Sequence, residues 1–299
     1  MTIPTAAHAP FGECHAHFAM DGVNYAQGMA RHKDGPSEAH IRACFEAYRK
    51  CDIAFVRDGG DKYGVSARAK RIAPEYGIDY RTPLFAIHRE GVYGGIVGRG
   101  FATMDEYATL VEEACAAGAD FIKIMTTGIM DFNEYGRIMY GSGLPAEEVR
   151  EMVHIAHACG RAVMAHTNGA RAIQVAAEAG VDSVEHGNYL DDAAIAALAE
   201  HGTCLVPTMA VAHNLRRSGL YNEASIERIC TMEREGVHAA WEAGVTIACG
   251  SDAGAVRVPH GQGTLDEYAC LVEAIGSKDA AGEALARGQD YIERTFMPW

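Results

Sequence analysis

Six side chains along the sequence have the chemistry to bind divalent metal ions: four imidazoles, one amine and one carboxylate. In chain order they are His15, His17, Lys123, His166, His186 and Asp252. The first two form a His-x-His pair, and a spacing of two residues in a β-strand places both side chains on the same side. Such a pair can clamp one metal ion, although two imidazoles can equally be hydrogen-bonded core residues.

Lys123 stands inside an otherwise apolar segment, DFIKIM (120–125). Either its long side chain reaches the rim of the fold and keeps its charge in water, or the amine is buried for a reason. Burial lowers the pKa of an amine, and a neutral amine can react with carbon dioxide to form a carbamate. Because a carbamate can bridge two cations as a carboxylate does, we predict carbon dioxide, bound as a carbamate on Lys123, as part of the cofactor set.

His166, His186 and Asp252 each end an apolar segment and are followed by small or polar residues. Each has a structural alternative, since a histidine can hydrogen-bond in a core and a carboxylate can cap the next helix. The six candidate side chains come from five separate segments of the chain, and a structural explanation would have to apply independently to each of them. A metal site that all of them share is therefore favoured. Histidine and carboxylate ligands without cysteine suit zinc, while manganese, iron, cobalt and nickel stay open. Two such ions, about 3.5–4 Å apart, can share a hydroxide whose parent water has its pKa brought from about 15.7 towards about 7.

Strands and helices must alternate along the chain to position these side chains. We expect eight strands, at 11–17, 53–58, 81–87, 120–125, 161–167, 182–187, 203–209 and 245–252. Glycine tolerates the left-handed backbone that closes a helix, and six helical segments stop at one: Gly77, Gly118, Gly160, Gly180, Gly202 and Gly244. This alternation predicts an α/β fold with a parallel sheet, and eight units predict one (β/α)8 TIM barrel that fills residues 1–299. An open doubly wound sheet is the alternative.

The composition of the chain limits the classes of molecule that it is expected to bind. The formal net charge of −14 and the absence of any Lys/Arg run argue against binding to nucleic acid or to an anionic membrane surface. We therefore expect a small-molecule substrate, with a homo-oligomer left open. Nine cysteines without a CxxC pair indicate reduced thiols and a cytoplasmic location. The start, MTIPTAAHAP, is unlike an export signal, and no apolar window approaches the ~18 residues of a membrane span.

The order of the six side chains resembles that of the amidohydrolase superfamily, in the subtype with a carboxylated lysine that bridges two metals. That subtype carries His-x-His on strand 1, lysine on strand 4, histidines on strands 5 and 6, and aspartate on strand 8. The local sequence is also similar to the branch that holds metal-dependent prolidases and imidazolonepropionase-like proteins. The similar segments, within roughly residues 11–276, are VRDGG (56–60), FIKIMTTG (121–128), SVEHGNYLDD (183–192), LVPTM (205–209) and GSDAG (250–254).

This resemblance implies a role for each of the six side chains. The implied ligands of the first metal are His15, His17 and Asp252. Those of the second metal are His166 and His186, and carboxylated Lys123 would bridge the two metals. Asp252 would also accept the proton from the attacking hydroxide and pass it to the leaving amine. Asp252 and Lys123 are therefore the expected catalytic residues, and no side-chain nucleophile is required.

The implied reaction is hydrolysis of an amide or peptide-like C–N bond by a metal-bridging hydroxide. The substrate would be small, such as an N-acyl amino acid, a dipeptide or a cyclic amide. A lactonase or a phosphotriesterase-like hydrolase with the same metal centre is the alternative. A non-hydrolytic lyase would usually work with one metal and no bridging lysine, and Lys123 argues against it. A binding protein without catalysis is disfavoured because the ligand set, including Asp252, is intact.

Two features depart from the pattern of the superfamily. Many relatives carry a small β-sandwich built from both ends of the chain, and we expect the barrel here to lack it. Glu13 stands where relatives usually have aspartate, two residues before the first histidine, and we expect it to adjust hydrogen bonds around the ligands without being one. Arg57 and Asp58 are candidates for a structural ion pair behind the site.

Substrate contacts are expected on the loops at the catalytic rim. We predict Tyr140, Tyr189 and His260 as substrate-binding residues, although each can equally be an ordinary polar loop residue. Further candidates on these loops are His88, Tyr93, Tyr135, Asn188 and His213. The long segment 126–145, rich in Gly, Met and Tyr, is the expected substrate-facing loop.

Overall fold

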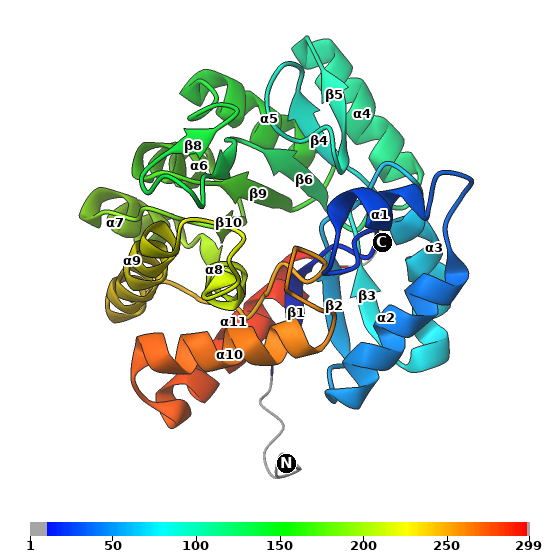
Figure 1. Ribbon diagram of the computed structural model, residues 1–299. Helices are drawn as coiled ribbons and strands as arrows, with labels where there is room; N and C mark the ends of the chain where they lie inside the picture. The colour runs from blue at the N-terminus through cyan, green and yellow to red at the C-terminus, as the bar shows by residue number, and fades with distance from the viewer. Residues whose placement is uncertain (1–10, 298–299) are drawn as a thin grey trace.

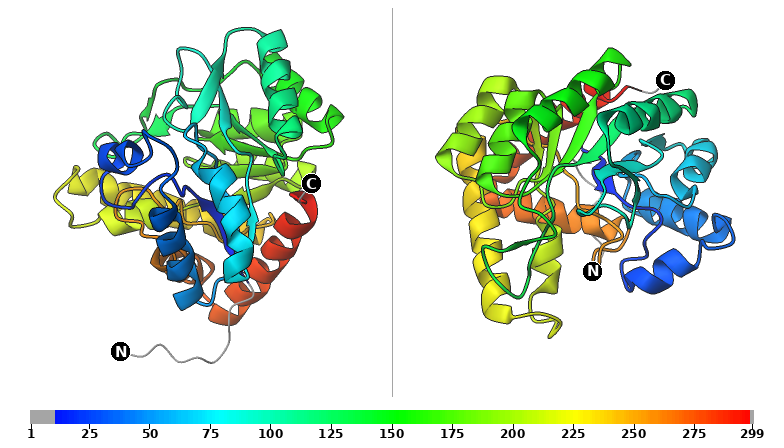
Figure 2. Two further views of the ribbon diagram at one scale, coloured as in Figure 1. Left: turned by 90° about the vertical axis from the view of Figure 1, so that its right-hand side faces the viewer. Right: turned by 90° about the horizontal axis from the view of Figure 1, so that it is seen from above.

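The computed structural model describes residues 11–297, in which short strands alternate with helices. Figure 1 shows the strands gathered in the middle of the molecule with the helices arranged around them, and Figure 2 gives two further views. The helices are α1 (Tyr25–Ala30), α2 (Glu38–Lys50), α3 (Val65–Ile72), α4 (Met104–Ala116), α5 (Ala146–Ala158), α6 (Ala170–Ala179), α7 (Asp192–His201), α8 (Ala210–Leu215), α9 (Glu223–Glu242), α10 (Gln262–Ile275) and α11 (Lys278–Thr295), with a 3-10 turn at Ala73–Tyr76.

The strands form two parallel sheets and one short antiparallel pair. The first sheet has the order β1 (Glu13–Ala16), β2 (Phe55–Asp58), β3 (Asp79–Arg81). The second has the order β11 (Cys204–Val206), β10 (Ser183–His186), β9 (Val163–Thr167), β6 (Ile122–Met125), β4 (Ala86–Arg89), β5 (Gly98–Phe101). The antiparallel pair is β7 (Ile129–Met130) and β8 (Ile138–Met139). The predicted α/β fold with a parallel sheet is confirmed.

Residues 245–253 connect the two sheets. The backbone amide of Leu205 in β11 donates to the carbonyl of Thr246 at 2.8 Å, and the amide of Cys14 in β1 donates to the carbonyl of Cys249 at 2.8 Å. Isolated bridges join the same segment to both strands. The segment thus lies between the last strand of the second sheet and the first strand of the first sheet. This arrangement is compatible with a TIM barrel.

Two of the eight predicted strands differ from the structure. The segment 245–252 forms isolated bridges and no continuous strand, and it ends at Asp252, whose φ is +59°. The predicted strand 81–87 is divided into β3 and β4, because Pro83 has no amide to donate and Leu84 has a φ of +67°. The strands β5, β7 and β8 lie outside the predicted segments, since none of them is a long apolar run.

The predicted glycine ends of the helices are confirmed. All six glycines have a φ between +66° and +88°. At Gly180, which follows α6, the amide donates to the carbonyl of Ala177 at 2.9 Å and so satisfies a carbonyl at the end of the helix. These turns reverse the chain after each helix and return it to the start of the next strand.

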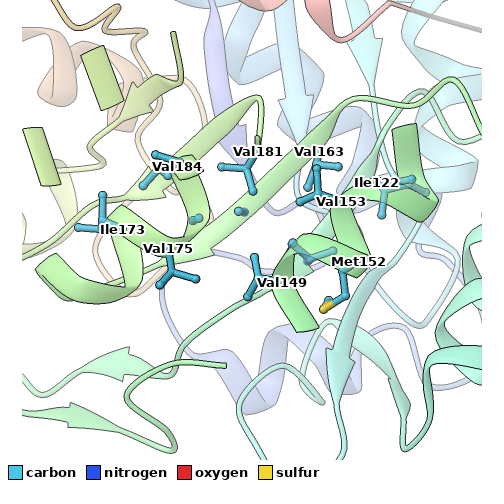
Figure 3. Packing of buried hydrophobic residues seen from close by; sticks show 14 of the residues in the cluster. Ile122, Val149, Met152, Val153, Val163, Ile173, Val175, Val181 and Val184 are labelled. Carbon is cyan, nitrogen blue, oxygen red and sulfur yellow. The ribbon is translucent and has the colours of Figure 1, made fainter. Parts of the chain in front are cut away.

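Alternate residues of the central strands face opposite ways. Ile122 of β6 and Val163 of β9 face outward and pack with Met152 and Val153 of α5 in the largest apolar cluster (Figure 3). Each such side chain contributes roughly 1.5–3 kcal/mol on burial. Phe121, which faces inward, belongs to a separate cluster among the strands. Since side chains alternate along β6, Lys123 also faces inward, on the same side as Phe121.

Glu267 is a buried carboxyl on α10. One of its oxygens accepts a hydrogen bond from the amide of Ala210 at 2.6 Å, and its other oxygen has no partner among residues 11–297. Burial raises the pKa of Glu267 from 4.5 to about 8. The unfolded chain therefore loses this proton at a lower pH than the folded chain does. As the pH rises through this window, ionisation favours the unfolded chain, so Glu267 lowers stability at neutral pH.

We expect Glu267→Gln to stabilise the folded chain by about 1–3 kcal/mol at pH 8 and by less at pH 5. Glutamine keeps an oxygen acceptor for Ala210 but cannot ionise. Urea unfolding at both pH values measures the difference, with Glu283→Gln, an exposed position on α11, as the control. A gain of the same size at both pH values would contradict the ionisation account.

Candidate metal centre

The four predicted histidine ligands lie together at the carboxyl ends of β1, β9 and β10. The ring centroids of His15 and His17 are 5.3 Å apart, and those of His15 and His186 are 4.9 Å apart. His166 completes the group, 4.6 Å from His186. The structure therefore gathers side chains that are widely separated in the sequence.

Asp252 lies beside the His-x-His pair. Its Oδ1 atom is 3.4 Å from Nε2 of His17 and 3.6 Å from Nε2 of His15. Ligand atoms of these three residues all lie within 4.8 Å of one another, which suits three ligands of one cation. The backbone at Gly59 passes so close that a Cβ there would lie 2.4 Å from the His17 ring, so only glycine leaves this ring in place.

One nitrogen of each remaining ring is held by the protein. Nε2 of His166 lies 3.0 Å from the carbonyl oxygen of Gly128, to which it can only donate. Nδ1 of His186 lies 2.7 Å from the hydroxyl oxygen of Thr208. The opposite nitrogens, Nδ1 of His166 and Nε2 of His186, are therefore the ones available to a metal. Fixing one nitrogen in this way orients a metal-binding histidine.

Burial keeps these imidazoles neutral. It lowers the pKa of His17 and of His166 from 6.5 to about 3, and it lowers the pKa of His15 and His186 well below 6.5. The nearby Lys123 amine lowers all four pKa values further. Metal binding requires neutral imidazoles, so at neutral pH these side chains are in the correct protonation state.

The amine of Lys123 is buried in the same place. The side chain is 1% exposed, and Nζ has no hydrogen-bond partner among the described residues. Burial lowers its pKa from 10.5 to about 8, although Glu185 and Asp252 act in the opposite direction. Burying an amine without a hydrogen-bond partner costs free energy. The lowered pKa makes the neutral, reactive form of this amine accessible near neutral pH. The imidazoles and the carboxylate thus fit a divalent cation, and the unpartnered amine lines the same cavity.

Two ligand positions have strained backbones. His186 has a φ of +68° and Asp252 a φ of +59°, and Thr208, the partner of His186, has a φ of +53°. These values are uncommon for residues with a side chain and cost about 1–3 kcal/mol each. Such strain persists where the surrounding structure holds it, and here it turns the side chains at the ends of neighbouring strands toward one centre.

Glu185 is a residue of this site that the sequence analysis missed. Its Oε2 lies 2.6 Å from Nδ1 of His15, and its Oε1 accepts from the Arg57 guanidinium at 2.8 Å. Arg57 also donates to the carbonyl of Cys14 at 2.7 Å, and both charged side chains are fully buried. Glu185 therefore orients the His15 ring and leaves its Nε2 for a metal.

The suggested ion pair between Arg57 and Asp58 is wrong. These neighbours in β2 face opposite ways, and Arg57 pairs with Glu185 across the interior. Asp58 instead accepts from the amides of Phe18 and Gly60, at 2.8 and 2.7 Å. It fixes the backbone on either side of the ligand pair.

We expect Glu185→Gln to lower metal affinity by about 10–100-fold, because the His15 ring loses a charged partner and Arg57 is left uncompensated. Competition with a metallochromic chelator measures this affinity. Glu178→Gln, on the exposed face of α6, is the control. If Glu185→Gln bound metal as tightly as the control does, other contacts would have to orient His15.

Glu13 does not reach a histidine ring. Its carboxylate accepts from the amide of His15 at 3.0 Å, from the amide of Ser251 at 2.8 Å and from the hydroxyl of Thr264 at 2.6 Å. Burial raises the pKa of Glu13 from 4.5 to about 7, despite these hydrogen bonds. Glu13 thus ties the backbone of the first ligand strand to the segment that carries Asp252.

The six side chains line one cavity of about 220 Å³. Much of its remaining wall is apolar, with Met130, Phe132 and Leu215 among the lining side chains. Tyr93 and Asn188, two further candidates of the sequence analysis, also line it, and the Tyr93 ring lies 5.1 Å from His166. The cavity places an apolar binding volume directly against the candidate metal ligands.

None of the three residues predicted to bind substrate is among the described residues that line the cavity. Tyr140 is 65% exposed on the segment 126–145. The hydroxyl of Tyr189 accepts from the amide of Gly136 at 2.9 Å, and His260 lies 3.1 Å from the carbonyl of Met20. Among the described residues, no contact supports a substrate role for these three side chains. Their substrate role stays a prediction. His88, Tyr135 and His213 also lie outside this lining.

His260 belongs to a second cluster of possible metal ligands, with His40 and Cys44. Nε2 of His40 and Nε2 of His260 lie 3.2 and 3.1 Å from the carbonyl oxygen of Met20. Cys44 Sγ is 3.6 Å from Nε2 of His40. The imidazoles thus already have backbone acceptors, and they hold the loop that follows the His-x-His pair.

The sequence of residues 14–283 matches the model of the amidohydrolase family. The chain belongs to this family. Membership supports the predicted enzyme class, a hydrolase acting on carbon–nitrogen bonds. An uncharacterized protein of Mycobacterium tuberculosis is 36% identical over 154 residues, which are 49% of this chain and 41% of that protein. The chain thus matches less than half the length of this relative.

Solved structures share the fold. A Xaa-Pro dipeptidase with bound methionine has a TM-score of 0.73 at 23% identity, over 94% of this chain and 75% of its own. An ochratoxinase of A. niger has a TM-score of 0.75 at 22% identity, over 94% of this chain and 71% of its own. Among residues 11–297, no helix has the length and apolar character to span a membrane. The single domain over 1–299, the homo-oligomer and the cytoplasmic location stay predictions.

Proposed function

We propose that this amidohydrolase cleaves an amide or peptide-like C–N bond of a small substrate with the help of two divalent cations. The observation that carries the proposal is the buried amine of Lys123, which has no partner among the described residues and lines one cavity with four neutral imidazoles and Asp252. The dipeptidase among the structural neighbours supports the choice of an amide.

Each side chain has a role in this proposal. The first cation would be held by His15, His17 and Asp252, the second by His166 and His186, and carboxylated Lys123 would bridge them. Zinc suits these ligands. We also propose that residues 245–253 close the strands into a TIM barrel, because this places all six groups at the carboxyl ends of its strands, where such barrels carry their sites.

When bound, the cations would polarise the scissile carbonyl and bring the pKa of water from about 15.7 towards about 7. Asp252 lines the cavity and would accept the proton of the attacking water, then deliver it to the leaving nitrogen. Glu185 and Thr208 keep the His15 and His186 rings in place while this happens. The apolar wall excludes competing water and holds the substrate.

Metal analysis of the purified protein, combined with a substrate panel, tests the proposal. The panel contains N-acyl amino acids, dipeptides, cyclic amides, lactones and phosphotriesters. We expect about two ions per chain and turnover confined to the amides. Faster turnover of lactones or phosphotriesters than of every amide would replace the proposed reaction with that of a lactonase or a phosphotriesterase. Turnover unaffected by chelation would contradict the metal site itself.

A further inference from the structure

We infer that the substrate carries an ammonium or another cationic N–H donor, which Glu233 binds at the α9 side of the cavity. This inference rests on the proposed function and narrows its substrate class. It starts from a carboxylate that none of the roles assigned above uses. Glu233 is 7% exposed and lines the same cavity as the metal ligands.

Glu233 occupies a core position of α9. The buried apolar residues of this helix lie along one face in two pairs, Ile226 with Ile229 and Val237 with Ala240, and the interval between the pairs is eight residues. Glu233 stands in this series where the spacing calls for another apolar side chain. Its neighbours on the preceding and following turns, Ile229 and Val237, are buried in apolar clusters.

A carboxyl group in such a place is costly without a partner. Among residues 11–297, no side chain forms a hydrogen bond or an ion pair with Glu233. Burial, together with the nearby carboxyl of Glu267, raises the pKa of Glu233 well above 4.5. Burying a polar group without compensation costs about 1–3 kcal/mol in proteins, and burying an ion costs more. A cationic ligand would remove this cost, and the cavity gives it access.

Asn188 presents a second acceptor without a donor on the same cavity wall. Its Oδ1 atom is buried and has no hydrogen-bond partner among the described residues. Its amide nitrogen donates to Oδ1 of Asn168 at 2.9 Å, and this contact fixes which end of the side chain is the oxygen. Glu233 and Asn188 also line a smaller pocket together, so they lie near each other. Both offer acceptors, and an ammonium offers donors only.

The cavity has no equivalent feature for an anionic substrate. Of the described residues that line it, Lys123 is the only lysine or arginine, and the proposal assigns this amine to the bridge between the metals. A substrate carboxylate would therefore find no cationic side chain away from the metal ligands. The apolar residues Met130, Phe132 and Leu215 suit the uncharged remainder of the substrate.

Matched anilides test this inference in the metal-loaded protein. Leucine p-nitroanilide is compared with its N-acetyl form, which tests an α-ammonium. N-acetyl-lysine p-nitroanilide is compared with N-acetyl-norleucine p-nitroanilide, which tests a side-chain ammonium. We expect one of the ammonium substrates to exceed its uncharged partner in kcat/KM by about tenfold or more, and Glu233→Gln to bring that ratio close to one. An unchanged ratio in Glu233→Gln would refute the inference.

Calorimetry provides a second readout that needs no turnover. The probe is n-hexylammonium, and N-hexylacetamide is its uncharged counterpart. We expect Glu233→Gln to weaken hexylammonium binding by about tenfold or more and to leave the affinity for the amide similar. Glu235→Gln, an exposed position on the same helix, is the control. Equal hexylammonium affinity in all three proteins would overturn the inference.

The two experiments separate the inference from the proposed function. Binding of hexylammonium that depends on Glu233, without hydrolysis of any amide, would leave the cation site standing and contradict the proposed reaction. Hydrolysis of amides with no dependence on Glu233 in either experiment would leave the reaction standing and remove the cation site.

Discussion

Replacing Lys123 with alanine is expected to lower bound metal from about two ions per chain to one or fewer and to abolish amide hydrolysis. The amine faces inward from β6, is 1% exposed and has no hydrogen-bond partner in residues 11–297. Without it, no carbamate can form, and the two groups of histidines lose the ligand that we propose they share. Elemental analysis of dialysed protein measures the metal content, and a spectrophotometric amide assay measures the rate.

Two comparisons make the Lys123 result specific. Lys278→Ala removes an exposed amine at the start of α11 and is expected to keep both metal and activity. Short carboxylic acids, such as acetate or propionate, fit the space left in Lys123→Ala and are expected to restore part of the metal content. Full metal occupancy with normal turnover in Lys123→Ala would exclude the bridging role. If circular dichroism shows that Lys123→Ala does not fold, the same measurements are made on Lys123→Met, which fills a similar volume without an amine.

The alternation of strands and helices could be predicted from the sequence, because each strand and each helix end is marked by residues close to it in the chain. Apolar runs mark strands such as β6 and β9, and the glycines after the helices mark where the chain turns back. The candidate ligands could be predicted for the same reason, since each lies at or near the end of a predicted strand, and the ends of parallel strands meet at one edge of the sheet. The segment 245–252 was harder, because its glycines and the left-handed Asp252 leave too few regular residues for a continuous strand.

Contacts across the interior could not be foreseen. Arg57 in β2 and Glu185 in β10 each stand at an inward position of a buried strand, so two unexplained charges of opposite sign were visible in the sequence. These strands are not neighbours in either sheet, and only the three-dimensional arrangement brings the two side chains to 2.8 Å. The sequence alone suggests Asp58 as the partner of Arg57, but the side chain of Asp58 faces the other way.

Substrate contacts were the least accessible part. Tyr140 and Tyr189 lie on loops whose course is set by long-range contacts, and polar residues alone do not show which way a loop folds. Glu233 carried a usable signal, since it is a carboxylate at a core position of a helix, and helical spacing identifies such a position. That signal concerns burial, however, and the structure was needed to show that this part of α9 faces the catalytic cavity.

Replacing Asp252 with asparagine is expected to reduce turnover by about 10²–10⁴-fold, because the variant loses the group that we propose accepts and returns the proton. Asparagine has nearly the same shape and can keep the positive φ of this position, so the fold is expected to survive. One ligand of the first cation is weakened as well, since a neutral amide oxygen replaces a carboxylate beside His15 and His17.

The two losses in Asp252→Asn can be separated by measuring turnover at saturating metal. If metal loss alone lowered the rate, excess metal would restore it; if the proton acceptor is missing, the rate stays low at full occupancy, which is the result we expect. A substrate with a better leaving group, an activated anilide in place of an alkylamide, is expected to lose less rate, because its nitrogen needs less help from a proton donor. Asp34→Asn, at an 89% exposed carboxylate, is the matched control. An unchanged rate in Asp252→Asn would place the proton acceptor at another residue of the cavity.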